Sequence, residues 1–134
     1  MKDILPLISP SAFFALEKDS TVLIDASFGR QNFENLHLRG ALHVDLNIDL
    51  SDIKDDFAKG GRHPLPSPEA FGGLLSRLGI TPETHVVVYD DKNGANAAAR
   101  FWWMMRAIGH QKIQVLDGGK EAALAAGIPR ESGP

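Results

Sequence analysis

The sequence predicts an α/β domain with three layers, in which helices cover both faces of a central parallel sheet of about five strands. Short apolar runs rich in β-branched residues alternate along the chain with amphipathic segments of helical length. A helix-length crossover between successive strands favours parallel pairing. The 134 residues correspond to one domain and are enough to bury a core without a disulfide or a metal.

The first third of the chain is expected to hold one short helix and two strands. Ser9 followed by Pro10 is typical of an N-cap and the first residue of a helix. The apolar run over residues 21–24 ends at an aspartate and has the length and branching of a buried strand. Residues 27–38 are polar and expected to be irregular, and residues 40–46 contain a second short strand.

A central helix is predicted after a proline-rich stretch. Residues 64–69 (PLPSPE) are typical of a capped helix start. Apolar residues at 71, 74, 75 and 78 then fall on one helical face. Gly79 is expected to end this helix, because glycine tolerates the left-handed conformation of a C-terminal cap.

The second half of the chain alternates strand and helix. Its long helix places Phe101, Met105 and Ile108 along one apolar stripe. The expected elements are, in order, the strand 85–89, a helix from Gly94 to its stop at Gly109, the strand 113–116 and a short helix over 120–126 that ends at Gly127.

The loop between the strand 85–89 and the following helix is the candidate reaction centre. In open parallel sheets, ligands bind outside the carboxyl ends of the strands. Backbone N–H groups in such a turn, backed by a helix N-terminus, can hold an anion. The middle of this loop carries a carboxylate. Its residues are Asp90, Asp91, Lys92, Asn93, Gly94, Ala95 and Asn96.

The composition excludes several classes of function. The chain contains no cysteine, which rules out disulfides, thiolate zinc sites and a thiol nucleophile within it. A formal net charge of −3 does not show the excess of positive charge that is typical of proteins that bind nucleic acid or an anionic membrane. The N-terminus shows no signal-peptide pattern, so a cytoplasmic location is the default expectation. Nothing in the sequence calls for a cofactor or a metal.

Several motifs, taken together, resemble the rhodanese-like domain family. Residues 33–41 (FENLHLRGA) match its F-x-x-x-H-[LIV]-P-G-A stretch, and residues 62–71 (RHPLPSPEAF) resemble the entry to its central helix. Residues 86–90 and 99–110 look like the first domain of two-domain thiosulfate or 3-mercaptopyruvate sulfurtransferases. The closing L-D-G-G at 116–119 and G-I-P at 127–129 are also similar.

The resemblance implies that the catalytic cysteine of this family is replaced here. Working members carry C-x-x-G-x-[TS]-[AS] in the loop, and their thiolate takes up sulfur as a persulfide. Aligning Gly94 with the family glycine puts Asp91 at the cysteine position and Asn96 at the Thr/Ser position. We therefore expect Asp91 to fill an inactive site. The alternative is that Asp91 is only a turn or N-cap aspartate.

The sequence departs from the family pattern at two further positions. Arg39 stands where the family has proline, and Ala123 stands where it usually has tryptophan four residues after L-D-G-G. The packing under the last helix is therefore expected to differ from that of the family.

The resemblance implies a place in a larger protein. We expect residues 1–129 to be an N-terminal, cysteine-less domain and residues 130–134 to begin a linker in a truncated chain. Its partner would be its own C-terminal rhodanese domain, with a small anionic sulfur donor at the domain interface. The sequence does not separate thiosulfate from 3-mercaptopyruvate as that donor. The candidate interdomain face consists of Arg100, Trp102, Trp103 and Arg106, and one tryptophan is expected to enter the core.

Two alternative functions remain open at this point. The first is a stand-alone rhodanese-like binding or regulatory module without sulfur chemistry. The second is a phosphoacceptor domain in which Asp90 and Asp91 bind Mg²⁺, with Asp25 and Asp117 as further carboxylates. The second alternative leaves the H-L-R-G-A and L-D-G-G stretches unexplained.

Metal binding is not expected. Residues 45–56 imitate a calcium loop, but Leu50 occupies the position that requires glycine and Asp52 the position of an apolar residue. His37 and His43 lack a second pair at metal spacing and are expected to bond to the backbone.

Overall fold

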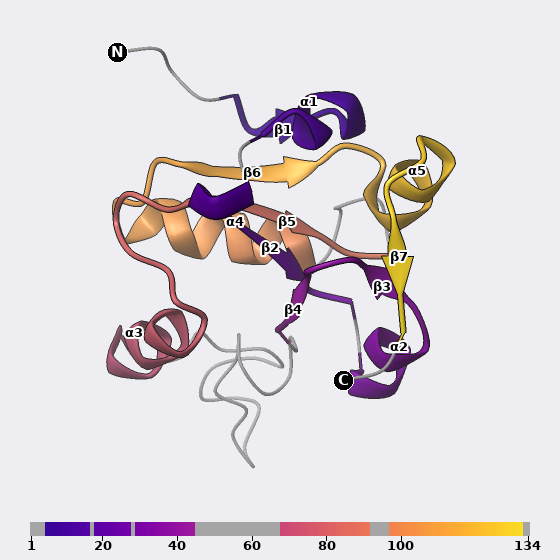
Figure 1. Cartoon of the computed structure of the whole chain (residues 1–134). Coiled ribbons are helices and arrows are strands. Elements are labelled where there is room, and N and C mark those ends of the chain that lie inside the picture. Colours follow the sequence, from indigo (N-terminus) through magenta and orange to yellow (C-terminus); the bar gives the residue numbers. More distant parts are fainter. Residues whose placement is uncertain (1–4, 17, 28, 45–67, 92–96, 133–134) are drawn as a thin grey trace.

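The computed structural model describes residues 5–16, 18–27, 29–44, 68–91 and 97–132 (Figure 1). The expected cap at Ser67 and the calcium-like residues 45–56 lie outside these ranges.

A parallel sheet of five strands forms the centre of the domain, as predicted, in the order β1-β6-β5-β2-β4. Every pair within it is parallel. β2 and β5 run side by side from Thr21↔His85 to Asp25↔Tyr89, so their carboxyl ends finish together. The strands are β1 (Leu7–Ile8), β2 (Thr21–Asp25), β4 (Leu42–His43), β5 (His85–Tyr89) and β6 (Ile113–Leu116).

Helices cover both faces of this sheet, which confirms the predicted three layers (Figure 1). A second, antiparallel pair joins β3 (His37–Leu38) to β7 (Arg130–Glu131). The helices are α1 (Pro10–Phe14), α2 (Arg30–Asn35), α3 (Pro68–Arg77), α4 (Ala97–Ala107) and α5 (Gly119–Ala125), with a 3-10 turn η1 (Lys18–Ser20).

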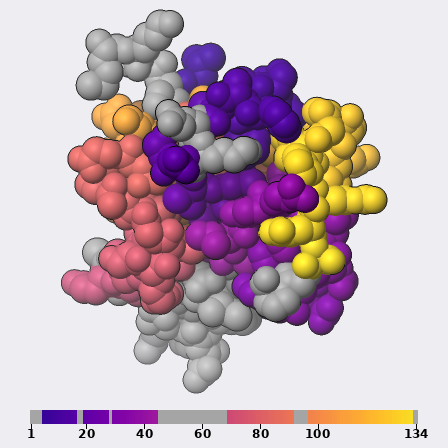
Figure 2. Space-filling model, viewed as in Figure 1, coloured from indigo at the N-terminus to yellow at the C-terminus, as the bar shows by residue number. Residues whose placement is uncertain are grey.

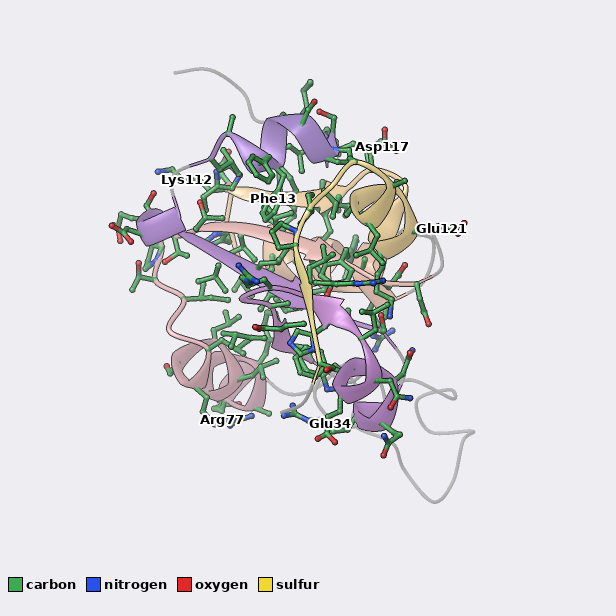
Figure 3. The ribbon with its side chains drawn as sticks, turned by 45° about the vertical axis from the view of Figure 1, so that its right-hand side comes forward. Phe13, Glu34, Arg77, Lys112, Asp117 and Glu121 are labelled. Carbon is green, nitrogen blue, oxygen red and sulfur yellow. The ribbon has the colours of Figure 1, made fainter. Side chains whose placement is uncertain are left out.

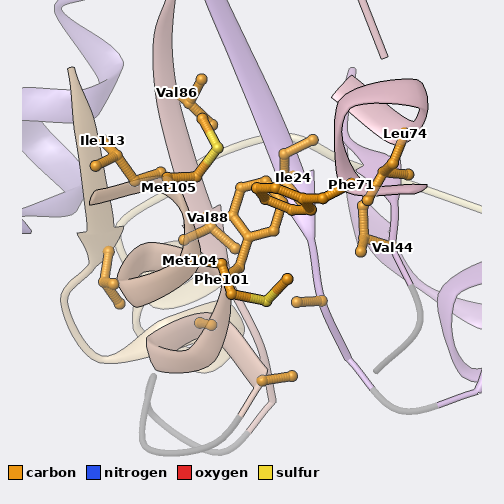
Figure 4. Close-up of a cluster of buried hydrophobic side chains, with 14 residues drawn as sticks. Ile24, Val44, Phe71, Leu74, Val86, Val88, Phe101, Met104, Met105 and Ile113 are labelled. Carbon is orange, nitrogen blue, oxygen red and sulfur yellow. The ribbon is translucent and has the colours of Figure 1, made fainter. Parts of the chain in front are cut away.

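Alternation along β5 divides the core into two clusters. Val86 and Val88 point into a cluster with α3 and α4, which contains Phe101 and Met105 (Figure 4). Val87 and Tyr89 point to the opposite face, where α1, α2 and α5 pack. Since successive strand residues face opposite sides, a fully buried strand reads as a continuous apolar run, and the sequence of β5 shows that run.

The helix ends follow the predicted chemistry. The Ser9 hydroxyl oxygen accepts a hydrogen bond from the Ala12 amide at 3.2 Å, which caps α1. Gly79 and Gly109 follow α3 and α4 with φ of 75° and 89°, the left-handed conformation that ends a helix.

Ala123 is fully buried in the cluster on the α5 side. A cavity of about 140 Å³ borders the same cluster and is lined in part by Phe13, Leu16 and Leu23. Ala123 does not line this cavity, whose other lining residues are Thr21, Arg39 and Gly40.

Four sequence expectations were wrong or incomplete. Residues 27–38 contain α2 and β3 instead of being irregular, and β1 was not predicted. Residues 130 and 131, expected in a linker, pair with β3 as β7. Ile108 lies beyond the end of α4 and is 55% exposed, so it does not continue the apolar stripe.

Within the described ranges, no helix is long and apolar enough to cross a membrane.

Candidate functional site

The carboxyl ends of β2 and β5 bring three polar side chains to one edge of the sheet. Asp25 and Tyr89 are register partners at the ends of the two strands, and Asp90 follows immediately. All three are almost completely buried. A buried polar group costs folding free energy unless it is hydrogen-bonded. The hydrogen-bond partners of these three side chains therefore determine how the edge is arranged.

The Tyr89 hydroxyl links three segments of the chain. It donates a hydrogen bond to Asp25 Oδ2 at 2.7 Å and accepts one from the Leu38 amide at 3.0 Å. The Ser27 amide donates to Asp25 Oδ1 at 2.8 Å. Burial, and then the charge of Asp25, raise the pKa of Tyr89. The phenol therefore stays protonated and acts as a fixed donor to the carboxylate.

Asp90 and Asp91 are neighbours in sequence but have different roles. Asp90 is buried, and its Oδ2 accepts a hydrogen bond from the Ala98 amide in the first turn of α4 at 2.9 Å. Its carbonyl oxygen also accepts from the Lys120 amide at 3.1 Å. The carboxylate thus satisfies an amide at a helix N-terminus and complements the helix dipole there.

Asp91, in contrast, is exposed. Its Oδ2 accepts a hydrogen bond from Asn32 Nδ2 on α2 at 2.8 Å. This contact ties the start of the candidate loop to a helix 59 residues earlier in the chain. The remaining loop residues, Lys92, Asn93, Gly94, Ala95 and Asn96, lie outside the described ranges.

His37 and His43 are bonded to backbone carbonyls, as expected. His37 Nδ1 donates to the Phe33 oxygen at 2.8 Å, and His43 Nε2 donates to the Ser27 oxygen at 3.1 Å. Both rings stack on Phe33. In the described part of the chain, no three His, Cys, Asp or Glu side chains are grouped so that they could hold a metal ion.

The candidate interdomain face lies on α4, and its two tryptophans are placed differently. Trp102 packs against the α3 and α4 cluster, with the guanidinium of Arg106 5.6 Å from its ring centre. Trp103 is 52% exposed. Partial burial lowers the pKa of Arg100, which still leaves it charged at neutral pH. The expectation that only one tryptophan faces the core agrees with this placement.

Sequence reasoning missed three features of the site. Tyr89 was predicted only as part of a strand, although its hydroxyl links Asp25 to Leu38. Asn32, the partner of Asp91, lies in a stretch expected to be irregular. Ser27 follows β2, and its hydroxyl oxygen is buried without a hydrogen-bond partner among the described residues. The available signal was position: polar residues just after the carboxyl ends of parallel strands gather at one edge.

We expect the two neighbouring carboxylates to differ in their contribution to stability. Asp90→Ala removes a buried acceptor from a helix N-terminus and should cost about 1–2 kcal/mol of unfolding free energy. Asp91→Ala changes an exposed side chain and should cost less than about 0.5 kcal/mol. Urea denaturation of both variants measures the difference. Asp90→Asn, which keeps an oxygen acceptor, is the conservative control, and equal losses for the two alanine variants would contradict the assignment.

The fold and this edge together define a parallel α/β domain in which the carboxyl edge of the sheet carries carboxylates and a neutral phenol. A model of the rhodanese-like domain family matches residues 14–126. Since the match covers most of the chain, the protein belongs to the rhodanese-like domain family.

Its relatives are named sulfurtransferases. The chain is 46% identical over 102 residues to thiosulfate/3-mercaptopyruvate sulfurtransferase 2 of Arabidopsis thaliana, covering 76% of this chain and 28% of that protein. It is 38% identical over 120 residues to the 3-mercaptopyruvate sulfurtransferase of Homo sapiens, covering 83% and 39%. The chain therefore spans well under half the length of these relatives.

Solved structures agree with the fold. The 3-mercaptopyruvate sulfurtransferase from Leishmania major superposes with a TM-score of 0.82 at 29% identity, over 96% of this chain and 36% of that one. SseA from Escherichia coli, described among 3-mercaptopyruvate sulfotransferases, gives a TM-score of 0.77 at 25% identity, over 97% and 52%.

Proposed function

We propose that this chain is the N-terminal, non-catalytic rhodanese-like domain of a sulfurtransferase that moves sulfane sulfur from thiosulfate or 3-mercaptopyruvate to a thiophilic acceptor. The observation that carries the proposal is the absence of cysteine from the whole sequence. Aligning the loop with the family motif puts Asp91 where the catalytic cysteine is expected. The relatives' names and their greater length support a second, catalytic part.

The reaction needs a nucleophile that this chain does not supply. A thiolate attacks the transferable sulfur of the donor and a new S–S bond forms, while the S–S bond of thiosulfate or the C–S bond of 3-mercaptopyruvate breaks. The electron pair of the broken bond leaves with sulfite, or with the enolate of pyruvate, which then takes up a proton. An acceptor thiolate or cyanide then removes that sulfur and regenerates the thiolate. A carboxylate oxygen forms no stable bond to sulfane sulfur, and Asp91 is already hydrogen-bonded to Asn32. The sulfur-carrying cysteine is therefore assigned to a C-terminal rhodanese domain.

The role that remains for this chain is to pack on the catalytic domain and form one wall of its cleft. Clefts between domains are common sites for small ligands. On α4, Trp103 is the better candidate for the contact, because Trp102 is already packed against the core. Arg100 and Arg106 would place positive charge near a small anionic donor.

Expression of the complete reading frame tests the proposal. We expect the 134-residue chain alone to show no thiosulfate:cyanide or 3-mercaptopyruvate sulfur transfer. The complete protein should turn over, and Cys→Ser in its C-x-x-G-x-[TS] loop should abolish turnover. Deleting the present domain should lower kcat/KM about a hundredfold, because loss of one cleft wall would misplace the substrate relative to the reacting groups.

Three outcomes would contradict the proposal. They are turnover by the purified chain alone, a deletion without effect on the catalytic part, and a reading frame that codes for no cysteine-bearing domain. The last outcome would favour the stand-alone rhodanese-like module.

A further inference from the structure

The end of the described chain is held against an internal turn of the domain. β7 pairs antiparallel with β3, in the register His37↔Glu131 and Leu38↔Arg130. Just before it, the Pro129 oxygen accepts a hydrogen bond from the Arg39 amide at 2.9 Å. The space-filling view shows the C-terminal residues in yellow lying over the magenta and purple surface of residues 30–44 (Figure 2).

The Glu131 carboxylate adds a side-chain contact to this pairing. Its Oε1 accepts hydrogen bonds from the Gly40 amide at 3.2 Å and from His37 Nε2 at 3.4 Å. The bond from Gly40 is the main cause of the lowered pKa of Glu131, with His37 as a smaller one. An otherwise exposed carboxylate is thereby tied to β3 and to the turn that follows it.

His37 connects Glu131 to the interior of the domain. Its ring is buried and stacks on Phe33, with 3.8 Å between ring centres and 8° between planes. Its Nδ1 donates to the Phe33 oxygen of α2 while Nε2 faces Glu131. Each ring nitrogen of His37 therefore lies against an oxygen acceptor, one from α2 and one from Glu131.

Position 39 contributes a bond that the usual family residue would not allow. Proline has no N–H and could not donate to the Pro129 oxygen, whereas Arg39 does so at 2.9 Å. The segment 129–131 is thus held at three consecutive residues, two of which depend on backbone donors at 39 and 40.

We propose that His37, Arg39, Gly40 and Glu131 form an exit clasp, which fixes the position and direction of the polypeptide as it leaves the domain at Ser132. The clasp rests on the proposed function, because a cleft between two domains needs a defined path of the chain from one domain to the other. Glu131 is a positioning residue in this arrangement.

The cysteine-free sequence allows a direct measurement of the chain path. Two cysteines, Ala107→Cys at the exposed end of α4 and Ser132→Cys beyond β7, carry spin labels in the otherwise unchanged chain. Pulsed electron double resonance then gives the distribution of distances between them. We expect one narrow distribution when Glu131 is present.

Substitutions of two exposed glutamates separate the clasp from a general loss of charge. Glu131→Ala should broaden the distance distribution at least about twofold, because the side-chain contacts to Gly40 and His37 are lost and only the backbone pairing remains. Glu131→Gln keeps an oxygen for the Gly40 amide and should broaden it less. Glu121→Ala is the matched control: Glu121 projects from α5 toward solvent, and its loss should change nothing (Figure 3).

Amide hydrogen exchange distinguishes positioning from structural support. In Glu131→Ala, protection should fall at Gly40 and Arg39, while Val87 in the sheet core keeps the protection of the parent chain. An unchanged distance distribution in Glu131→Ala would overturn the clasp. An equal loss of protection at Val87 would overturn it too, since Glu131 would then support the whole fold. Neither measurement involves sulfur transfer, so failure of the clasp is distinguishable from failure of the proposed function.

Discussion

Replacing Phe101 by alanine is expected to lower the free energy of unfolding by about 3–5 kcal/mol. The ring is fully buried at the centre of the cluster between α4 and the sheet, edge-on to Phe71 with 6.1 Å between ring centres. Its removal loses both apolar burial and close contacts, because a packed interior collapses only in part around the space left. A loss of this size is comparable to the whole stability of many small domains.

Urea denaturation followed by circular dichroism measures the effect of Phe101→Ala. Phe14→Ala is a matched control, since the Phe14 side chain on α1 is 54% exposed and its removal should cost less than about 1 kcal/mol. Similar losses for the two variants would show that the cluster on the α4 side does not dominate the stability of the domain.

Replacing Tyr89 by phenylalanine is expected to cost about 3 kcal/mol, although only one oxygen atom is lost. The buried Asp25 carboxylate would lose its donor at 2.7 Å, and the Leu38 amide would lose its acceptor at 3.0 Å. Leaving a buried charge with fewer hydrogen bonds costs more than the net value of the bond itself. The free energy of unfolding of Tyr89→Phe, measured with urea, gives the size of the effect.

A double-mutant cycle identifies the cause. Asp25→Asn removes the charge that Tyr89→Phe leaves with one hydrogen bond fewer. The unfolding free energy lost by the double variant should therefore be smaller than the sum of the two single losses, by about 1 kcal/mol or more. Strict additivity of the two losses would show that Tyr89 and Asp25 do not act as a pair.

The elements with a strong local signal were predictable from the sequence. Residues 86–89 of β5 are an unbroken apolar run and are all buried, and β5 lies between β2 and β6 inside the sheet. Ser9 with Pro10, and the glycines at 79 and 109, mark helix ends through local backbone chemistry alone. These signals, in alternation, were enough to predict the parallel sheet and its three layers.

The elements that were missed depend on distant partners. β1 has two residues and forms because the Val115 amide donates to the Pro6 oxygen at 2.7 Å. β7 forms only against β3, more than ninety residues earlier in the chain. No periodicity can show over two residues, so such strands become visible only once the pairing is known.

α2 shows a weaker signal that could have been used. Arg30–Glu34 and Gln31–Asn35 are i,i+4 pairs on its surface, and Phe33 is the apolar residue that it buries. Such pairs each contribute a few tenths of a kcal/mol, which is too little to outweigh a polar composition in a short segment. Packing of Phe33 in the second cluster decides the conformation instead.

The candidate site was predictable in its place but not in its details. The carboxyl edge of the sheet follows from strand order, and it does hold Asp90 and Asp91. The sequence could not show which of two adjacent aspartates is buried, because β-strand alternation is lost at the strand end. It also could not show that Asn32 meets Asp91, since that contact requires α2.

The two edge strands of the central sheet are both very short. β1 and β4, at its two ends, each contribute only two residues to the described structure. Long unpaired outer strands are templates for joining further molecules into aggregates, and short ones are a natural protection against this. A parallel sheet built slowly from distant segments is most exposed to such association during folding. The brevity of its outer strands therefore favours recovery of this domain from dilute denaturant as separate molecules.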